Sequence, residues 1–193
     1  LEGESSFKDL KKSYAKGKEL AGKTLGIIGF GRIGQEVAKR AIGLGMNVVA
    51  HDKFVDSVNI DLNFFNGQTI NFEITPTSLE EVLKKSDFIT LHIPKIGDKA
   101  VIGAEEIGMM KDGAGIVNAA RGGVIDEDAL MFALEKGKLD YAGLDVFENE
   151  PTPSIHLLMQ ANVSLTPHIG AATLEAQDRI GTELADKIAA FFK

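Results

Sequence analysis

The chain has 193 residues, 44% of them hydrophobic and 25% charged, and this length and balance suit one domain with a full hydrophobic core. It has no cysteine, which excludes a disulfide framework and a thiolate metal site, and we expect no metal. The net charge of −7 argues against nucleic acid and anionic membranes as partners. The apolar runs are too short to span a bilayer, so we expect a cytoplasmic protein.

Short apolar runs alternate with segments of helical periodicity along most of the chain. These runs show little internal alternation, which is typical of strands buried on both faces of a parallel sheet. Repeated β-α units with right-handed crossovers predict an α/β fold, a doubly wound parallel sheet of the Rossmann type. The expected strands are 24–29, 46–51, 87–91, 114–118, 141–146 and 163–166, and the expected helices are 31–44, 78–85, 103–110, 126–136 and 172–192.

Three segments break this alternation. Residues 1–22 are interpreted as a solvated N-terminal helix and linker, and 23–193 as the sheet domain. Residues 53–77 are long and mixed, with a short strand considered at 69–74, and 147–162 are expected to form a proline-containing loop. The basic stretch in the first segment, for which a nucleic-acid role is the weaker interpretation, consists of Lys8, Lys11, Lys12, Lys16 and Lys18.

Two of the expected helices show an apolar stripe. In the helix at 31–44 the stripe is expected to pack on the sheet, and in the helix at 172–192 Thr173 is a plausible N-cap. The stripes are Ile33, Val37, Ala41 and Leu44 in the first helix, and Ile180, Leu184, Ile188 and Phe191 in the second.

The segment GFGRIG at 29–34 follows an apolar strand and opens an amphipathic helix. Alone this pattern is a weak signal, but its position between a strand and a helix is the one that dinucleotide binding requires. Gly29 would permit the tight turn, Gly31 would let the backbone approach a pyrophosphate, and Gly34 would let helix and strand pack closely.

The start of the same helix predicts an anion site. The amides of Arg32 and Ile33 are expected to meet the phosphates along the helix dipole. Asp52 ends the next strand, where it would accept hydrogen bonds from the adenosine ribose hydroxyls. Its charge would repel a 2′-phosphate, and the only cation beside it is Lys53, so NAD is favoured over NADP. The alternative is an ordinary glycine turn with a surface aspartate.

Three more segments begin where later strands end, and together they offer a cation, a carboxylate and an imidazole. Arg121 can hold a carboxylate in a bidentate fork, His168 can transfer the proton of a hydroxyl, and Glu150 can fix the imidazole tautomer. Each residue alone could be an ordinary surface residue, and the argument rests on their joint occurrence. Glu148 is the next candidate for the partner of His168. His51 and His156 are interpreted as structural.

The segments LGIIGFGRIG, VNAARGGVIDEDAL, GLDVFENEP and LTPHIGAAT resemble the D-isomer-specific 2-hydroxyacid dehydrogenase family, from about Lys23 to the C-terminus. The resemblance implies that Arg121 binds the substrate carboxylate and carbonyl, that His168 is the acid/base, and that Glu150 is its partner. It also implies a cofactor lining: Asp145 at the nicotinamide carboxamide, the backbone of Ala119, Ala120, Gly170 and Ala171, and His92 and Pro94 at the adenosine side.

The C-terminal segment is most similar to the phosphoglycerate dehydrogenase branch, which implies 3-phosphoglycerate as the small anionic 2-hydroxy or 2-keto acid substrate. Glu150 disfavours the formate dehydrogenase branch, which has glutamine at that position. One alternative is an NAD-sensing transcriptional corepressor of the C-terminal binding protein type, which shares the Arg, Glu and His. Another is a freestanding NAD-binding module without chemistry. The family implies a homodimer through this domain. It also implies a substrate domain on both flanks, which this chain lacks, so we expect the isolated chain to be inactive.

Overall fold

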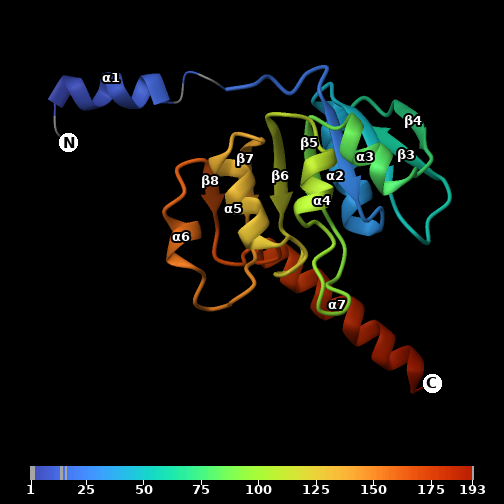
Figure 1. The fold of residues 1–193 in the computed structure, drawn as a ribbon. Helices are drawn as coiled ribbons and strands as arrows, with labels where there is room; N and C mark the ends of the chain where they lie inside the picture. The colour runs from blue at the N-terminus through green and yellow to red at the C-terminus, as the bar shows by residue number, and fades with distance from the viewer. Residues whose placement is uncertain (1–2, 14, 16, 193) are drawn as a thin grey trace.

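The computed structural model describes residues 3–13, 15 and 17–192. One parallel sheet forms the centre of the fold, and its arrowheads point to one edge (Figure 1). Its strands lie in the order β2 (Asn47–His51), β1 (Thr24–Ile28), β5 (Phe88–Leu91), β6 (Ala114–Asn118), β7 (Leu139–Leu144) and β8 (Val163–Leu165). The predicted doubly wound α/β fold is confirmed, and each of these strands lies within two residues of its expected bounds.

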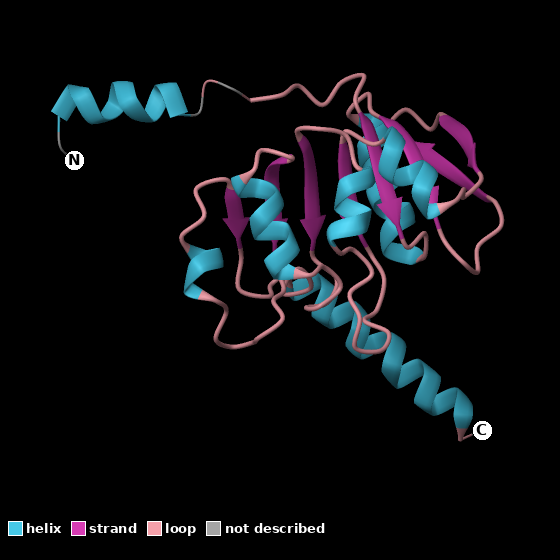
Figure 2. Cartoon of the chain, in the orientation of Figure 1, coloured by secondary structure: helices cyan, strands magenta, loops and turns pink. Residues whose placement is uncertain are grey.

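Helices cover both faces of this sheet (Figure 2). Successive residues of a strand point to opposite faces, and in β1 the side chain of Ile27 joins one hydrophobic cluster while Ile28 joins the other. The cluster of Ile28 includes residues of α3 (Leu79–Lys85), α4 (Ala104–Met109) and α5 (Glu127–Glu135), and that of Ile27 includes residues of α2 (Arg32–Gly43).

The strand order reverses at β1, which has β2 on one side and β5 on the other. Open parallel sheets bind ligands in the crevice at such a switch point, beyond the carboxyl ends of the strands. The glycine turn at 29–34 leaves β1 at this point, and His92 follows β5 there. The fold therefore places the predicted dinucleotide motif where a ligand crevice is expected.

The segment 53–77 is more regular than the sequence interpretation allowed. It forms an antiparallel hairpin of β3 (Val58–Asn63) and β4 (Thr69–Ile74), so the strand considered at 69–74 is present and β3 was missed. Val58, Ile60 and Leu62 alternate with polar residues, and an Asn66-Gly67 turn lies between the strands, which are the usual hairpin signals. Ile60 is buried in the α2 cluster, which anchors the hairpin.

The buried face of α2 differs from the expected one. Ile33 and Leu44 are exposed, whereas Gly34, Ala38 and Ala41 are buried. Close approach of the helix to β1 buries the small residues, and the half-buried Val37 packs against the same cluster from the side. The predicted stripe is therefore confirmed at Val37 and Ala41 and wrong at Ile33 and Leu44.

The remaining helices lie at the two ends of the chain and in the expected loop. α6 (Ile155–Leu158) is a single turn inside 147–162, and it was missed. α1 (Gly3–Ser13) and α7 (Leu174–Phe191) project from the body (Figure 1). Thr173 caps α7 as predicted, with its hydroxyl accepting from the amide of Ala176 at 3.2 Å, but no residue of α7 is buried.

The linker between α1 and β1 contacts the sheet domain through the backbone of Gly22, whose amide donates to Gly45 at 2.8 Å, and through the side chain of Lys18. Lys18 donates to the carbonyl of Gly113 and to Asp140, each at 2.7 Å. Lys16 of the basic stretch lies outside the described residues, and the boundary between 22 and 23 stays a prediction. No helix within the described ranges has the length and apolarity needed to cross a bilayer.

Candidate active site

The glycine turn after β1 is held by close backbone contacts. Gly29 has a φ of 94°, which glycine adopts without steric cost, and its amide donates to the carbonyl of His51 at 2.8 Å. A Cβ on Gly29 would lie 2.5 Å from the carbonyl oxygen of His92, and one on Gly34 would lie 2.2 Å from that of Gly29. Both positions therefore require glycine for the protein's own packing.

Gly31 is different, because a Cβ there would meet no atom within 4 Å. Gly31 is the N-cap of α2, and no side chain caps this helix. The first amides of a helix lack internal partners and favour an anion, so the open space before Arg32 and Ile33 fits the pyrophosphate of a dinucleotide. The Arg32 side chain itself is 87% exposed and pairs with Glu183 of α7 at 3.3 Å.

Asp52 lies beside the turn, as expected, but its carboxylate already binds three backbone amides. One oxygen accepts from Phe30 at 2.7 Å, and the other accepts from Phe54 at 2.8 Å and Val55 at 3.2 Å. A carboxylate offers about four acceptor positions, so about one remains for a ribose hydroxyl. The sequence interpretation missed this second role, in which Asp52 ties the glycine turn to the loop after β2.

His92 and Pro94 follow β5 on the other side of the switch point. The amide of His92 donates to Ile28 at 2.7 Å, and its Nε2 lies 3.0 Å from the hydroxyl of Thr90. Burial lowers the pKa of the His92 imidazole, which favours the neutral ring. Pro94 is exposed. Both residues follow β5 at the switch point, and their position beside a bound dinucleotide stays a prediction.

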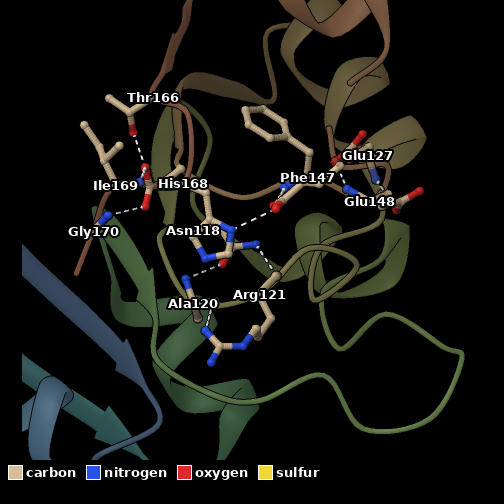
Figure 3. Close-up of polar contacts among 12 residues, drawn as sticks. Asn118, Ala120, Arg121, Glu127, Phe147, Glu148, Thr166, His168, Ile169 and Gly170 are labelled. Atoms are coloured by element: carbon tan, nitrogen blue, oxygen red, sulfur yellow. Dashed lines mark hydrogen bonds and ion pairs between the residues drawn. The ribbon is translucent and has the colours of Figure 1, made fainter. Parts of the chain in front are cut away.

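The loop after β6 presents Arg121 at the surface. The buried Asn118 holds this loop closed, because its side-chain amide donates to the carbonyl of Arg121 at 2.9 Å and its oxygen accepts from Ala120 at 3.1 Å. The Arg121 guanidinium donates to the carbonyl of Ala120 at 2.6 Å (Figure 3). In the described part of the chain it forms no hydrogen bond or ion pair with Glu150 or His168. Asn118 belongs to the segment VNAARGGVIDEDAL, but the sequence did not predict this role.

Asp145, after β7, shapes the loop that carries His168. Its carboxylate accepts from the hydroxyl of Thr166 and from the amides of Ile169 at 2.8 Å and Gly170 at 2.7 Å (Figure 3). Burial raises the pKa of Asp145, but these hydrogen bonds together outweigh burial and bring the pKa below its ordinary value. The loop needs this support, because His168 has a φ of 56°, a left-handed conformation that is costly for histidine.

The loops after β6 and β8 meet at Gly170. A Cβ there would lie 2.9 Å from the Asp145 carboxylate and 3.9 Å from the carbonyl of Ala119. Ala171 follows and is exposed. The two backbone segments predicted to line the nicotinamide therefore lie close together at the carboxyl edge of the sheet.

Glu150 and His168 form the pair expected from the sequence. Nδ1 of His168 lies 2.8 Å from one carboxylate oxygen of Glu150, and the other oxygen accepts from the amide of Phe147 at 3.0 Å. The hydrogen bond from His168, followed by that from Phe147, holds the pKa of Glu150 below its ordinary value. A hollow of about 380 Å³ adjoins the pair, lined mainly by Phe147, Pro151, Pro153, Leu158, Leu165 and Pro167.

Glu148, the alternative partner of His168, points elsewhere. It exchanges hydrogen bonds with Glu127, the first residue of α5 (Figure 3). The other histidines have different partners: His51 contacts the carbonyl of Thr77 at 2.8 Å, and His156 lies 3.8 Å from Glu135. Within the described part of the chain, no cluster of side chains could hold a metal ion.

Comparisons with a family profile, with curated relatives and with solved structures all match this chain to dehydrogenases or reductases of one family. The profile described as D-isomer specific 2-hydroxyacid dehydrogenase, NAD binding domain, matches residues 2–170. Hydroxypyruvate reductase of Thermotoga maritima is 49% identical over 92% of this chain and 56% of its own length. D-3-phosphoglycerate dehydrogenase of Methanocaldococcus jannaschii is 47% identical over 90% of this chain and 32% of its own length.

A solved structure, the holo form of D-mandelate dehydrogenase from Rhodotorula graminis, superposes with a TM-score of 0.77. It is 34% identical, and the match covers 90% of this chain and 49% of that one. The chain thus spans about half the length, or less, of the proteins that it resembles.

Proposed function

Because the chain belongs to the D-isomer specific 2-hydroxyacid dehydrogenase family, as its NAD-binding domain, we propose that it carries the catalytic residues of an NAD-dependent D-2-hydroxyacid dehydrogenase. The observation that carries this proposal is the 2.8 Å contact between His168 and Glu150. It lies at the sheet edge that also holds the glycine turn. NAD, when bound, would take up hydride from the alcohol carbon or return it to the keto carbon.

His168 would transfer the proton of this reaction. An ionised Glu150 can only accept a hydrogen bond, so Nδ1 of His168 must carry the proton in their contact. Nε2 of the neutral ring then has a free lone pair for the proton of a substrate hydroxyl, and a protonated ring can return it to a keto oxygen. Glu150 thus selects the tautomer that the reaction requires.

Arg121 would bind the substrate carboxylate. A guanidinium has five N–H donors in a planar fork, and one of them donates to Ala120. The remaining donors can form the bidentate pair with a carboxylate that orients the reacting carbon. The exposed position of Arg121 leaves it accessible to such a substrate.

Asp52 is proposed to select NAD over NADP, because its charge would repel a 2′-phosphate. Calorimetry of this chain with both cofactors tests the assignment, and NAD should bind more tightly. Asp52→Ala should weaken NAD binding and reduce the difference in affinity between NAD and NADP. The control is Asp56→Ala, which alters an exposed aspartate in the same loop. Equal or tighter binding of NADP to the parent chain would contradict the assignment. A thermal melt of each variant would detect loss of the three amide contacts of Asp52.

For the substrate we propose 3-phosphoglycerate. The C-terminal segment and the relatives named D-3-phosphoglycerate dehydrogenase support this choice. Because another relative is named hydroxypyruvate reductase, the competing substrate is the unphosphorylated acid, D-glycerate. The ratio of kcat/KM for D-3-phosphoglycerate and D-glycerate, in the enzyme that contains this domain, decides between them. A ratio below one would refute the phosphorylated substrate. Homodimerisation and a cytoplasmic location stay predictions.

A further inference from the structure

Glu127 and Glu148 form a reciprocal contact that the proposed chemistry does not use. The Glu127 carboxylate accepts from the amide of Glu148 at 2.7 Å, and the Glu148 carboxylate accepts from the amide of Glu127 at 3.1 Å (Figure 3). Glu127 is only 9% exposed. Burial raises the pKa of Glu127, an effect that the Glu148 amide opposes and the charges of Glu148 and Asp128 reinforce. Burying a carboxylate costs free energy, so we expect the contact that holds it to have a structural or functional role.

This contact joins the two segments that carry the predicted catalytic residues. Glu127 lies six residues after Arg121, and Glu148 lies two residues before Glu150. The segments already touch at Gly122, where a Cβ would lie 1.7 Å from the carbonyl oxygen of Phe147. Close backbone packing sets their separation. The Glu127 hydrogen bond fixes the orientation of the same peptide group, because the Phe147 carbonyl and the Glu148 amide belong to one peptide.

We propose that Glu127 is a positioning residue, whose carboxylate fixes the loop 147–150 so that Glu150 is held against His168. The path has three steps. Glu127 binds the amide of Glu148, the preceding amide of Phe147 donates to Glu150 at 3.0 Å, and Glu150 contacts His168 at 2.8 Å. Glu150 is exposed, so it has few other contacts that could hold its orientation.

The role of Glu127 can be measured without turnover, through the ionisation of Glu150. The Phe147 amide contributes to the low pKa of Glu150, and a displaced loop would lose that contribution. Carboxyl NMR of this chain should show the Glu150 pKa rising toward its ordinary value in Glu127→Met, which keeps the length of the side chain but not its strong acceptor. Glu127→Gln keeps an acceptor oxygen, so it should leave the Glu150 pKa unchanged.

Two further variants complete the series. Asp128→Asn removes a neighbouring exposed charge without touching the loop, so it should leave the Glu150 pKa unchanged. Glu127→Asp keeps the charge but shortens the reach, so it should act like Glu127→Met, and it remains informative if the methionine variant does not fold. An unchanged Glu150 pKa in folded Glu127→Asp or Glu127→Met would overturn the proposal. So would a glutamine variant that behaves like methionine.

The catalytic consequence rests on the proposed function and is measured in the enzyme that contains this domain. Misplacing a catalytic group by about 1 Å can cost up to 100-fold, so Glu127→Met should lower kcat/KM by roughly tenfold or more. Glu127→Gln should restore most of it, and NAD affinity should be unchanged. No turnover by the parent enzyme would refute the proposed function alone, because the Glu150 pKa in this chain would still decide the role of Glu127.

Discussion

Gly31→Ala separates ligand binding from folding in the glycine turn. The substitution adds a methyl group where no protein atom lies within 4 Å, and the φ of −74° at this residue suits alanine. Reduced freedom of the unfolded chain would stabilise the protein by about 0.4–1 kcal/mol. The poorer helix cap would cost about as much. We therefore expect the free energy of unfolding to change by less than about 1 kcal/mol.

The same methyl group would stand where a pyrophosphate approaches the first amides of α2. Losing one hydrogen bond to a charged group costs about 1.5–3 kcal/mol, which corresponds to a roughly 10- to 150-fold weaker Kd. Calorimetry with NAD measures the affinity, and urea denaturation measures the stability. Gly108→Ala in α4 is the matched control, because a Cβ there also meets no atom within 4 Å.

Gly34→Ala should lower the stability of the protein, because the added methyl group would clash with the protein itself and not with a ligand. Its Cβ would lie 2.2 Å from the carbonyl oxygen of Gly29, a backbone atom that cannot rotate away. Overpacking of this kind costs about 1–3 kcal/mol of stability. If Gly31→Ala bound NAD as tightly as the parent chain, the amides of α2 would not be the pyrophosphate site and the reasoning would be refuted.

Three further outcomes are expected. This chain alone should turn over hydroxy acids poorly, because one wall of the cleft cannot hold the reacting carbon; activity near that of a full-length relative would contradict this. Arg121→Lys should raise KM without moving the pH profile, since lysine keeps the charge but loses the fork; an unchanged KM would exclude Arg121 as the carboxylate ligand. The lowered pKa of Glu150 means that its negative charge persists until the pH falls through that lowered value. Glu150→Gln removes this charge, which stabilises a protonated imidazole. The pH profiles of kcat/KM for oxidation and for reduction should therefore both move to lower pH. If neither profile moved, Glu150 would have no part in the acid/base step.

The sequence predicted the parallel sheet well, because each of its strands is a short apolar run and most of them are followed by a segment of helical periodicity. It failed where the pattern was local but overlooked, as in β3, whose alternation and Asn66-Gly67 turn were there to read. It also misjudged the buried face of α2. The close approach of Gly34 to Gly29 was predicted from the glycine motif, but helical periodicity did not show that this approach leaves Ile33 and Leu44 exposed.

The site was predicted as a set of residues at strand ends, and the structure places these residues along one edge. The sequence could not reveal how that edge is held together. The amide partners of Asp145 lie 24 and 25 residues away, and Glu127 and Glu148 are 21 apart, so these hydrogen bonds exist only after the sheet has formed. Part of the role of Asp52 was accessible, since Phe54 and Val55 lie just beyond it.

The most direct test of the dehydrogenase proposal is NADH formation by the enzyme that contains this domain, with the D- and L-isomers of glycerate and 3-phosphoglycerate. We predict oxidation of a D-isomer only, and a loss of kcat in His168→Asn while NAD still binds. His156→Asn, which alters an exposed histidine away from the pair, is the control and should keep full activity. Tight NAD binding without turnover of any of these acids, as expected of a corepressor, would contradict the proposal.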